Sequence, residues 1–263
     1  MYPGKVLRAG SSGADVSKIQ QRLHDLGVRD ATGKDLAVDG GFGPSTDAAV
    51  RLFQARSFDD SGQPLEVDGT VGPMTWAALF REAVTPAPVP AGNYLAEVIN
   101  LARAQVGVME DPLGSNRGPM VDEFLKRVGL NPVGHHYAWC AAFVYWCFDE
   151  AAVKTGKSNP APKSAGVLET WQMAGQAKHL RYTPNQAANA PELIKPGFVF
   201  FLDTGQGNGH MGIVAGVAGT KLTTIEGNTT NVTGSREGIG VFERNARTIP
   251  QVNLGFADYT QQA

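Results

Sequence analysis

A proline-rich segment, residues 81–92 (REAVTPAPVPAG), divides the chain. Three prolines alternate there with small residues, and proline lacks the backbone N–H that helices and sheets use. Such a segment is typical of a semi-rigid, extended linker. Because 263 residues exceed the usual size of one domain, we expect two compact units, residues 1–80 and residues 93–263, on either side of this linker.

The first unit contains an internal repeat. The segment DGGFGPSTDAAV, which starts at Asp39, aligns with DGTVGPMTWAAL, which starts at Asp68. Each copy has an Asp-Gly and a Gly-Pro turn ahead of a run with helical spacing of its apolar residues. The same spacing occurs upstream in Val16, Ile19 and Leu23. We therefore predict a small bundle of three helices.

The second unit changes character along its length. Residues 94–107, 119–130 and 139–153 have apolar side chains every three or four positions, which indicates helices. After residue 195 come four short segments rich in β-branched and aromatic residues, separated by glycine-rich turns. They begin at Phe198, His210, Lys221 and near Val241. Helices followed by antiparallel strands predict an α+β fold with the helices packed on one face of a sheet.

Two cysteines, Cys140 and Cys147, lie in the third predicted helix of this unit. Their Cα atoms would be roughly 10 Å apart at ~1.5 Å per residue, which is too far for a disulfide. Cys140 is expected at the start of the helix, where free backbone N–H groups and the helix dipole favour a thiolate. Cys147 lies two turns later among apolar residues and is expected to fill the core. Cys140 is therefore the candidate nucleophile.

A nucleophilic thiol needs a base, and the base needs a polar group to orient it. His210 begins a predicted strand directly after a glycine-rich loop, which would place it at the rim of the sheet. The next strand returns antiparallel through a turn near Gly219, so residue 228 would come back beside His210. Glu226 and Asn228, two residues apart, would face the same side of the sheet. Either could accept the imidazole N–H.

Each of these residues taken singly has an ordinary explanation as a core thiol, a surface histidine, a solvated strand end or a turn former. Their combination favours catalysis. His135 and His136 lack the spacing of a zinc site and are interpreted as loop residues beside the candidate site. Glu110 and Asp111 lack the alternating carboxylates of a calcium loop. We therefore expect no bound metal and no cofactor.

The motifs resemble two known families. In residues 5–80, the patterns GxxGxDVxxIQxRLxxLG, DGxFGPxT, AVxxFQ and DGxVGPxTW resemble the peptidoglycan-binding domain of type 1. The resemblance implies a non-catalytic domain that holds muropeptide. In the second unit, WCAAFV, GHMGIV and IEGNT resemble the CHAP family of cysteine, histidine-dependent amidohydrolases and peptidases. That resemblance implies a papain-like fold.

The CHAP resemblance also implies roles for the site residues. Cys140 would be the nucleophile, His210 the general base and then acid, Glu226 the residue that orients His210, and Asn228 an auxiliary polar member. The expected function is hydrolysis of an amide bond in peptidoglycan, by an N-acetylmuramoyl-L-alanine amidase or an endopeptidase. The whole arrangement resembles a modular phage endolysin, and we expect a monomer.

Charge and hydropathy bear on partners and location. The net charge is only −2, which argues against nucleic acid or an anionic membrane as partner. No apolar run of signal-peptide length occurs at the start, so we expect synthesis in the cytoplasm and action on the wall after the membrane has been breached. Two alternatives remain open: a wall-binding or virion structural protein without catalysis, and a zinc amidase, which EDTA would inactivate.

Overall fold

The computed structural model describes residues 2–29, 34–57, 59, 65–80, 94–229 and 238–262. The chain divides into two compact units, Met1–Pro86 and Ala87–Ala263, and each is described by itself. The predicted linker, residues 81–92, lies outside the described residues.

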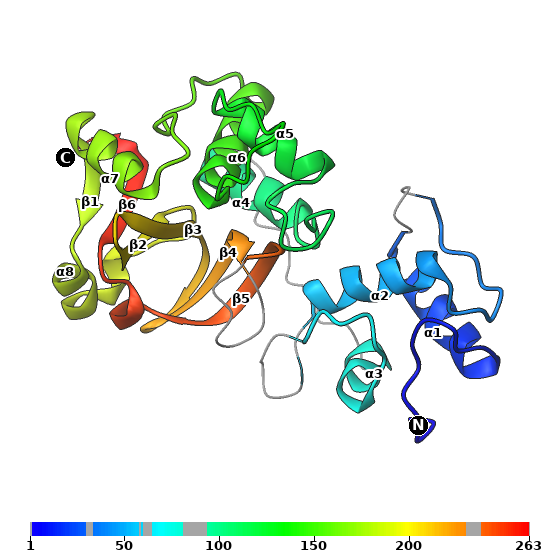
Figure 1. The fold of residues 1–263 in the computed structure, drawn as a ribbon. Helices are drawn as coiled ribbons and strands as arrows, with labels where there is room; N and C mark the ends of the chain where they lie inside the picture. The colour runs from blue at the N-terminus through cyan, green and yellow to red at the C-terminus, as the bar shows by residue number, and fades with distance from the viewer. Residues whose placement is uncertain are drawn as a thin grey trace. The chain divides into compact units, whose positions relative to one another are not determined.

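The first unit is the predicted bundle of three helices (Figure 1). They are α1 (Ala14–Asp25), α2 (Pro44–Ala55) and α3 (Pro73–Phe80). Pro44 and Pro73 each occupy the first residue of a helix, where their missing N–H costs no hydrogen bond. The apolar faces of the helices meet in one core, which includes Ile19, Val50 and Leu79.

The sequence repeat corresponds to a repeated hydrogen-bonded clamp. A buried glutamine from the preceding helix, Gln20 in the first copy and Gln54 in the second, holds each Asp-Gly turn. Gln20 donates to the carboxylate of Asp39 and accepts from the backbone N–H of Gly40, both at 2.8 Å. Gln54 makes the same two contacts in the second copy, at 2.8 and 2.9 Å. These bonds satisfy polar groups that the small core would otherwise bury unpaired.

The second unit is built on a six-stranded sheet with the order β1-β6-β2-β3-β4-β5. Every pair of neighbouring strands is antiparallel. The strands are β1 (His179–Tyr182), β2 (Val199–Gly205), β3 (Asn208–Ala218), β4 (Lys221–Thr229), β5 (Gly240–Thr248) and β6 (Gly255–Gln262).

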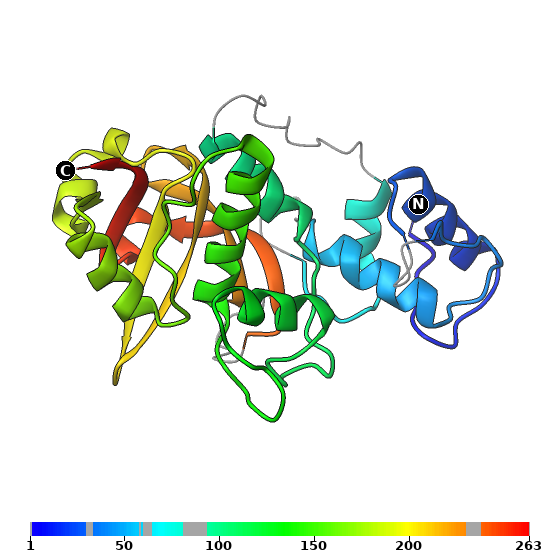
Figure 2. The same cartoon turned by 90° about the horizontal axis from the view of Figure 1, so that it is seen from above.

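The α-helices of this unit are α4 (Tyr94–Ala104), α5 (Pro119–Arg127), α6 (Cys140–Thr155), α7 (Val167–Gln176) and α8 (Pro184–Asn189). Two 3₁₀ turns, Pro191–Leu193 and Ile249–Gln251, complete the described elements. Figure 1 shows α4, α5 and α6 gathered beside β3 and β4, and Figure 2 shows the same helices standing along the strands from above. The helix α6 packs on β3 and β4.

The sheet is covered on both faces. The main core joins α4, α5, α6 and α7 to strand residues such as Val199, Phe201 and Ile213. A second core, which includes Phe200 and Val214, lies against α8 and the two 3₁₀ turns. Alternate residues of β2 enter different cores because successive side chains of a strand point to opposite faces.

The α+β prediction is confirmed, with two additions. The four predicted strands are β2, β3, β4 and β5, and the three predicted helices are α4, α5 and α6. The prediction did not include β1 and β6, which pair with each other and extend the sheet beyond β2. It also placed helices on one face only, whereas α8 covers part of the other. Neither cysteine forms a disulfide, as predicted. None of the helices that the structure describes is both apolar and long enough for a membrane span.

Candidate active site

The candidate nucleophile, Cys140, is the first residue of α6. Trp139 precedes it at the N-cap and supplies no side-chain hydrogen bond to the first turn. The N–H groups of a first helical turn have no partner within the helix and carry partial positive charge. Cys140 is only 3% exposed. A substrate would therefore meet the sulfur at the floor of the site rather than on an open surface.

The second half of the site is the hairpin of β3 and β4. A turn at Gly219, with a φ of 59°, reverses the chain so that Ala218 pairs with Lys221 and Ile213 with Ile225. Towards the open end of the hairpin, His210 Nε2 lies 2.8 Å from Glu226 Oε2. The hairpin, whose register shifts once between Val214 and Gly216, thus brings His210 and Glu226 together from two strands.

Glycine at position 227 lets β4 approach the helix that carries Cys140. A Cβ at Gly227 would lie 2.7 Å from Cβ and Cγ of Phe143, one turn after Cys140. No side chain larger than hydrogen fits this space without moving the helix. Because Glu226 is the chain neighbour of Gly227, the same close approach brings Glu226 near α6.

The carboxylate of Glu226 is fully buried and accepts four hydrogen bonds. Oε1 accepts from Thr224 Oγ1 at 2.6 Å and from Arg247 Nε at 2.9 Å. Oε2 accepts from Arg247 Nη2 at 2.8 Å and from His210 Nε2. Burial raises the pKa of Glu226, but the charge of Arg247 and the bond from His210 outweigh it and hold that pKa well below its usual range.

His210 stands between this carboxylate and the thiol of Cys140. Because the Glu226 carboxylate accepts at Nε2, that nitrogen carries a proton, and Nδ1 remains as the second nitrogen that can gain or lose one. Burial lowers the pKa of His210. Hydrogen bonds to Cys140 and Glu226, together with their charges, outweigh burial and raise the pKa to about 9. The side chain of His210 is 17% exposed, whereas that of Glu226 is fully buried and Cys140 is 3% exposed. The imidazole is therefore the most accessible of the three groups.

Asn228 occupies a different position. Its φ of 51° lies in the left-handed region, and its amide oxygen would meet a Cβ on Gly238 at 2.4 Å. Within the part of the chain that the structure describes, no hydrogen bond joins Asn228 to His210. The structure therefore brings together Cys140, His210 and Glu226 and leaves Asn228 where β4 ends.

The segment before Cys140 is anchored by Glu110. One carboxylate oxygen accepts from Trp139 Nε1 at 2.8 Å and the other from the backbone N–H of Asn116 at 2.9 Å. Glu110 and Trp139 are buried, and the indole stacks on Phe124 at 5.8 Å between ring centroids. Glu110, weighed in the sequence only as a calcium ligand, thus fixes the residue that precedes the candidate nucleophile.

Three other residues considered in the sequence, Cys147, His135 and His136, lie outside the candidate site. Cys147 is fully buried, and burial raises the pKa of its thiol well above the usual value, as expected of a core residue. His135 is exposed and stacks on Tyr137 at 5.1 Å between ring centroids. His136 Nδ1 lies 2.7 Å from the carbonyl oxygen of Ser115. Among the described residues, no group of three or more His, Cys, Asp or Glu side chains is placed to hold a metal ion.

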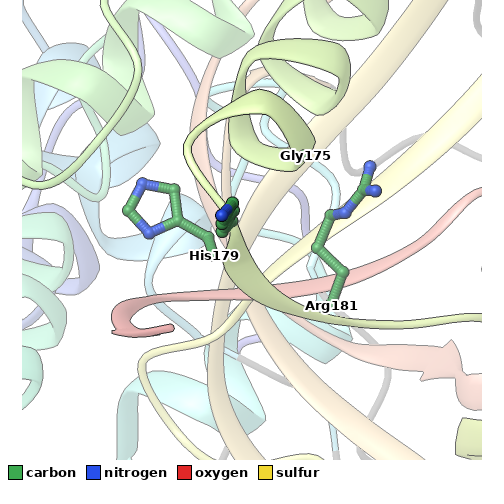
Figure 3. A pocket seen from close by; sticks show the side chains of 4 residues that line it. Gly175, His179 and Arg181 are labelled. Atoms are coloured by element: carbon green, nitrogen blue, oxygen red, sulfur yellow. The ribbon is translucent and has the colours of Figure 1, made fainter. Parts of the chain in front are cut away.

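A pocket elsewhere in the unit lies at the end of α7 (Figure 3). Gly175, Lys178, His179 and Arg181 line it, and Figure 3 shows the side chains of His179 and Arg181 pointing apart. Arg181 stacks over Trp171, with its guanidinium carbon 4.5 Å from the ring centroid. Cations near the last turn of a helix complement its dipole. The pocket shares no residue with the candidate site.

The sequence did not predict the part of three residues at the candidate site, Arg247, Thr224 and Glu110. Thr224 could have been found, because it lies two residues from Glu226 on the same strand and faces the same side. Arg247 comes from β5, whose register against β4 shifts twice along the pair. No local pattern in the sequence predicts its position.

Comparisons with known proteins agree with the two resemblances. The family model of the CHAP domain matches residues 132–228, and that of the peptidoglycan binding domain matches residues 12–79. The first interval contains Cys140, His210 and Glu226 but not Arg247. A search of curated proteins finds no match. Among solved structures, the chain is similar to the crystal structure of Burkholderia AP3 phage endolysin, with 25% identity and a TM-score of 0.24. The similarity covers 58% of this chain and 63% of that endolysin.

Proposed function

Because the chain combines a peptidoglycan binding domain with a CHAP domain, we propose that it is a peptidoglycan hydrolase of the endolysin type. The catalytic residues would be Cys140, His210 and Glu226, acting as thiol, base and orienting carboxylate. The observation that carries the proposal is the hydrogen bond from His210 to the buried Glu226, with Cys140 at the start of α6 as the second group that raises the pKa of this imidazole. This is the arrangement that thiol-dependent acyl transfer requires.

The reaction would proceed through a thioester. The Cys140 thiolate attacks the amide carbonyl carbon, and the new C–S bond gives a tetrahedral oxyanion. Backbone N–H groups at the start of α6 would stabilise that charge. His210 then protonates the leaving amine as the C–N bond breaks. Finally, neutral His210 takes a proton from water as its oxygen attacks the thioester carbonyl, and the C–S bond breaks. This step gives a carboxylic acid and restores the Cys140 thiolate with protonated His210.

The first unit would act as the wall anchor. A separate binding module raises the local concentration of the catalytic unit at an insoluble substrate without adding contacts at the scissile bond. Within the proposal, the bond cut is either the N-acetylmuramoyl-L-alanine amide or a peptide bond of the stem or crossbridge.

Digestion of purified peptidoglycan sacculi, followed by mass spectrometry of the products, would test the proposal. An amidase releases intact stem peptides with a new L-alanine amino terminus, whereas an endopeptidase converts crosslinked muropeptides to smaller ones that keep their sugars. We expect iodoacetamide to abolish the release and EDTA to spare it, because the proposed nucleophile is a thiol. Release that resists iodoacetamide and stops with EDTA would instead indicate the zinc amidase.

The raised pKa of His210 predicts an alkaline limit to activity. With a pKa of about 9 instead of 6.5, the imidazolium persists through neutral pH. Cleavage of sacculi should therefore slow as the pH rises through about 9, where His210 loses the proton it gives to the leaving amine. Stability has the same sign, since the contribution of a raised pKa is complete below 6.5 and disappears through about 9. Initial rates across neutral and alkaline pH measure the limit, and a decline already complete near neutrality would contradict it.

A further inference from the structure

Arg247 reaches the candidate site from a strand that carries none of its proposed catalytic residues. On β5 it pairs in register with Leu222 of β4, outside the interval that the CHAP family model matches. Its Nε and Nη2 donate to the two oxygens of Glu226, at 2.9 and 2.8 Å. Such a bidentate contact fixes the plane of a carboxylate and stabilises its ionised form. The side chain of Arg247 is only 15% exposed.

The surroundings of this pair leave the carboxylate one orientation. The guanidinium carbon of Arg247 lies 4.4 Å from the centroid of the buried Phe200 ring. A Cβ at Gly212 would come within 2.8 Å of that ring and 2.9 Å of Glu226 Cγ, so Gly212 packs closely against both side chains. Thr224 holds Oε1. The surrounding side chains and the bidentate contact with Arg247 therefore hold Oε2 of Glu226 toward His210.

The charges around Glu226 are few among the described residues. His210 faces it from β3 and Arg247 from β5, while Thr224 of β4 and Phe200 of β2 are uncharged. Arg244, also on β5, donates to Thr229 instead. Cys140 of α6 acts on His210 as well. Arg247 is thus the permanent positive charge that balances Glu226.

We infer that Arg247 is a positioning residue, which holds Glu226 ionised and aimed at His210 and thereby sets the pH range in which Cys140 and His210 work. This inference rests on the proposed function. Removing a permanent positive charge makes every neighbouring group hold its proton more tightly. Without Arg247, both the formation of the Cys140 thiolate and the loss of the His210 proton should shift to higher pH.

A matched control is an ion pair between α4 and β5. Arg103 of α4 forms the same forked pair with Glu243 of β5, at 2.7 to 3.2 Å, and is 25% exposed. Among the described residues, neither member of that pair forms a hydrogen bond or ion pair with Cys140, His210 or Glu226. Arg103→Met therefore removes a forked ion pair of similar burial without touching the site.

The test compares Arg247→Met, Arg247→Lys and Arg103→Met by the pH dependence of sacculus cleavage. We expect both limbs of the Arg247→Met profile to move up by about one pH unit. Arg247→Lys keeps the positive charge but not the bidentate contact. The limbs of its pH profile should therefore stay in place while its cleavage rate falls ~10-fold. The limbs of Arg103→Met should match wild type. Unmoved limbs in Arg247→Met would overturn the inference.

A second measurement does not depend on wall cleavage. The pH dependence of Cys140 alkylation by iodoacetamide, followed on the peptide that contains it, reports thiolate formation directly. In Arg247→Met this curve should also move to higher pH. If wild type fails to cut sacculi while the alkylation curve moves, the proposed function fails and the charge balance by Arg247 stands. If Arg247→Met does not fold, Arg247→Lys decides, since a wild-type rate in that variant would overturn the positioning role.

Discussion

Replacement of Cys140 by alanine is expected to abolish release of soluble fragments from sacculi, with a loss of about 10⁴-fold or more. The reason is that no thioester can form without the sulfur, and neither His210 nor Glu226 can supply a nucleophile in its place. The fold should survive, because the change removes a single atom from the first residue of α6. Fragment release, measured beside the thermal unfolding midpoint, separates the two effects.

Cys147→Ala is the matched control for that variant. Cys147 lies on the same helix and is fully buried in the core. Its truncation should lower the free energy of unfolding by about 1 kcal/mol while cleavage persists. The two variants thus predict opposite outcomes in the two measurements. Substantial cleavage by Cys140→Ala would show that the wall is cut by other chemistry or is only bound.

The second large effect is expected for Glu226→Gln, a substitution that keeps the shape of the side chain and removes its charge. Cleavage should fall by about 10² to 10⁴-fold, because the amide cannot stabilise the imidazolium of His210 or select its tautomer. The variant should also lose roughly 3 kcal/mol of stability, because the forked, mostly buried Arg247 is left without its counter-charge.

Two further variants separate catalysis from stability. Glu243→Gln, on the neighbouring strand β5, breaks the ion pair with Arg103 of α4 and should cost stability alone. The double variant Glu226→Gln with Arg247→Met removes the unpaired charge, so it should regain part of the stability without regaining cleavage. If Glu226→Gln loses no more activity than Glu243→Gln, then Glu226 has no part in the chemistry. Initial rates on sacculi and thermal melts of the same preparations provide both readouts.

Local patterns in the sequence were sufficient for the elements that position the site. The helix of Cys140 is apparent from an apolar run that follows a polar loop, and the hairpin from two alternating segments joined by Gly219. Since a tight turn largely determines the register of its strands, the sequence brought the segment of Glu226 and Asn228 back beside His210, although the register shifts once between Val214 and Gly216. The same calculation brought Asn228 to the histidine, but in the structure its amide oxygen lies close to Gly238.

Contacts between distant segments were not predictable in this way. Arg247 is 21 residues from Glu226 and belongs to a strand pair with two register shifts. Glu110 is 29 residues from Trp139 and comes from the loop between α4 and α5. From the sequence alone, Arg247 has no predicted role, and Glu110 was considered only as a calcium ligand. Burial against specific partners gives both their roles, and burial is a property of the packed chain.

The sequence by itself determined the two units, their α-helical and α+β characters, and the approach of His210 to Glu226 or Asn228 across one hairpin. These depend on residue periodicity and turn chemistry, which act over a few neighbouring positions. Only the tertiary structure decided that Arg247 locks Glu226 in place and that Glu110 anchors the residue before Cys140. A buried ionised group must find its counter-charge and hydrogen-bond donors wherever the fold brings them, and no short-range rule specifies that place.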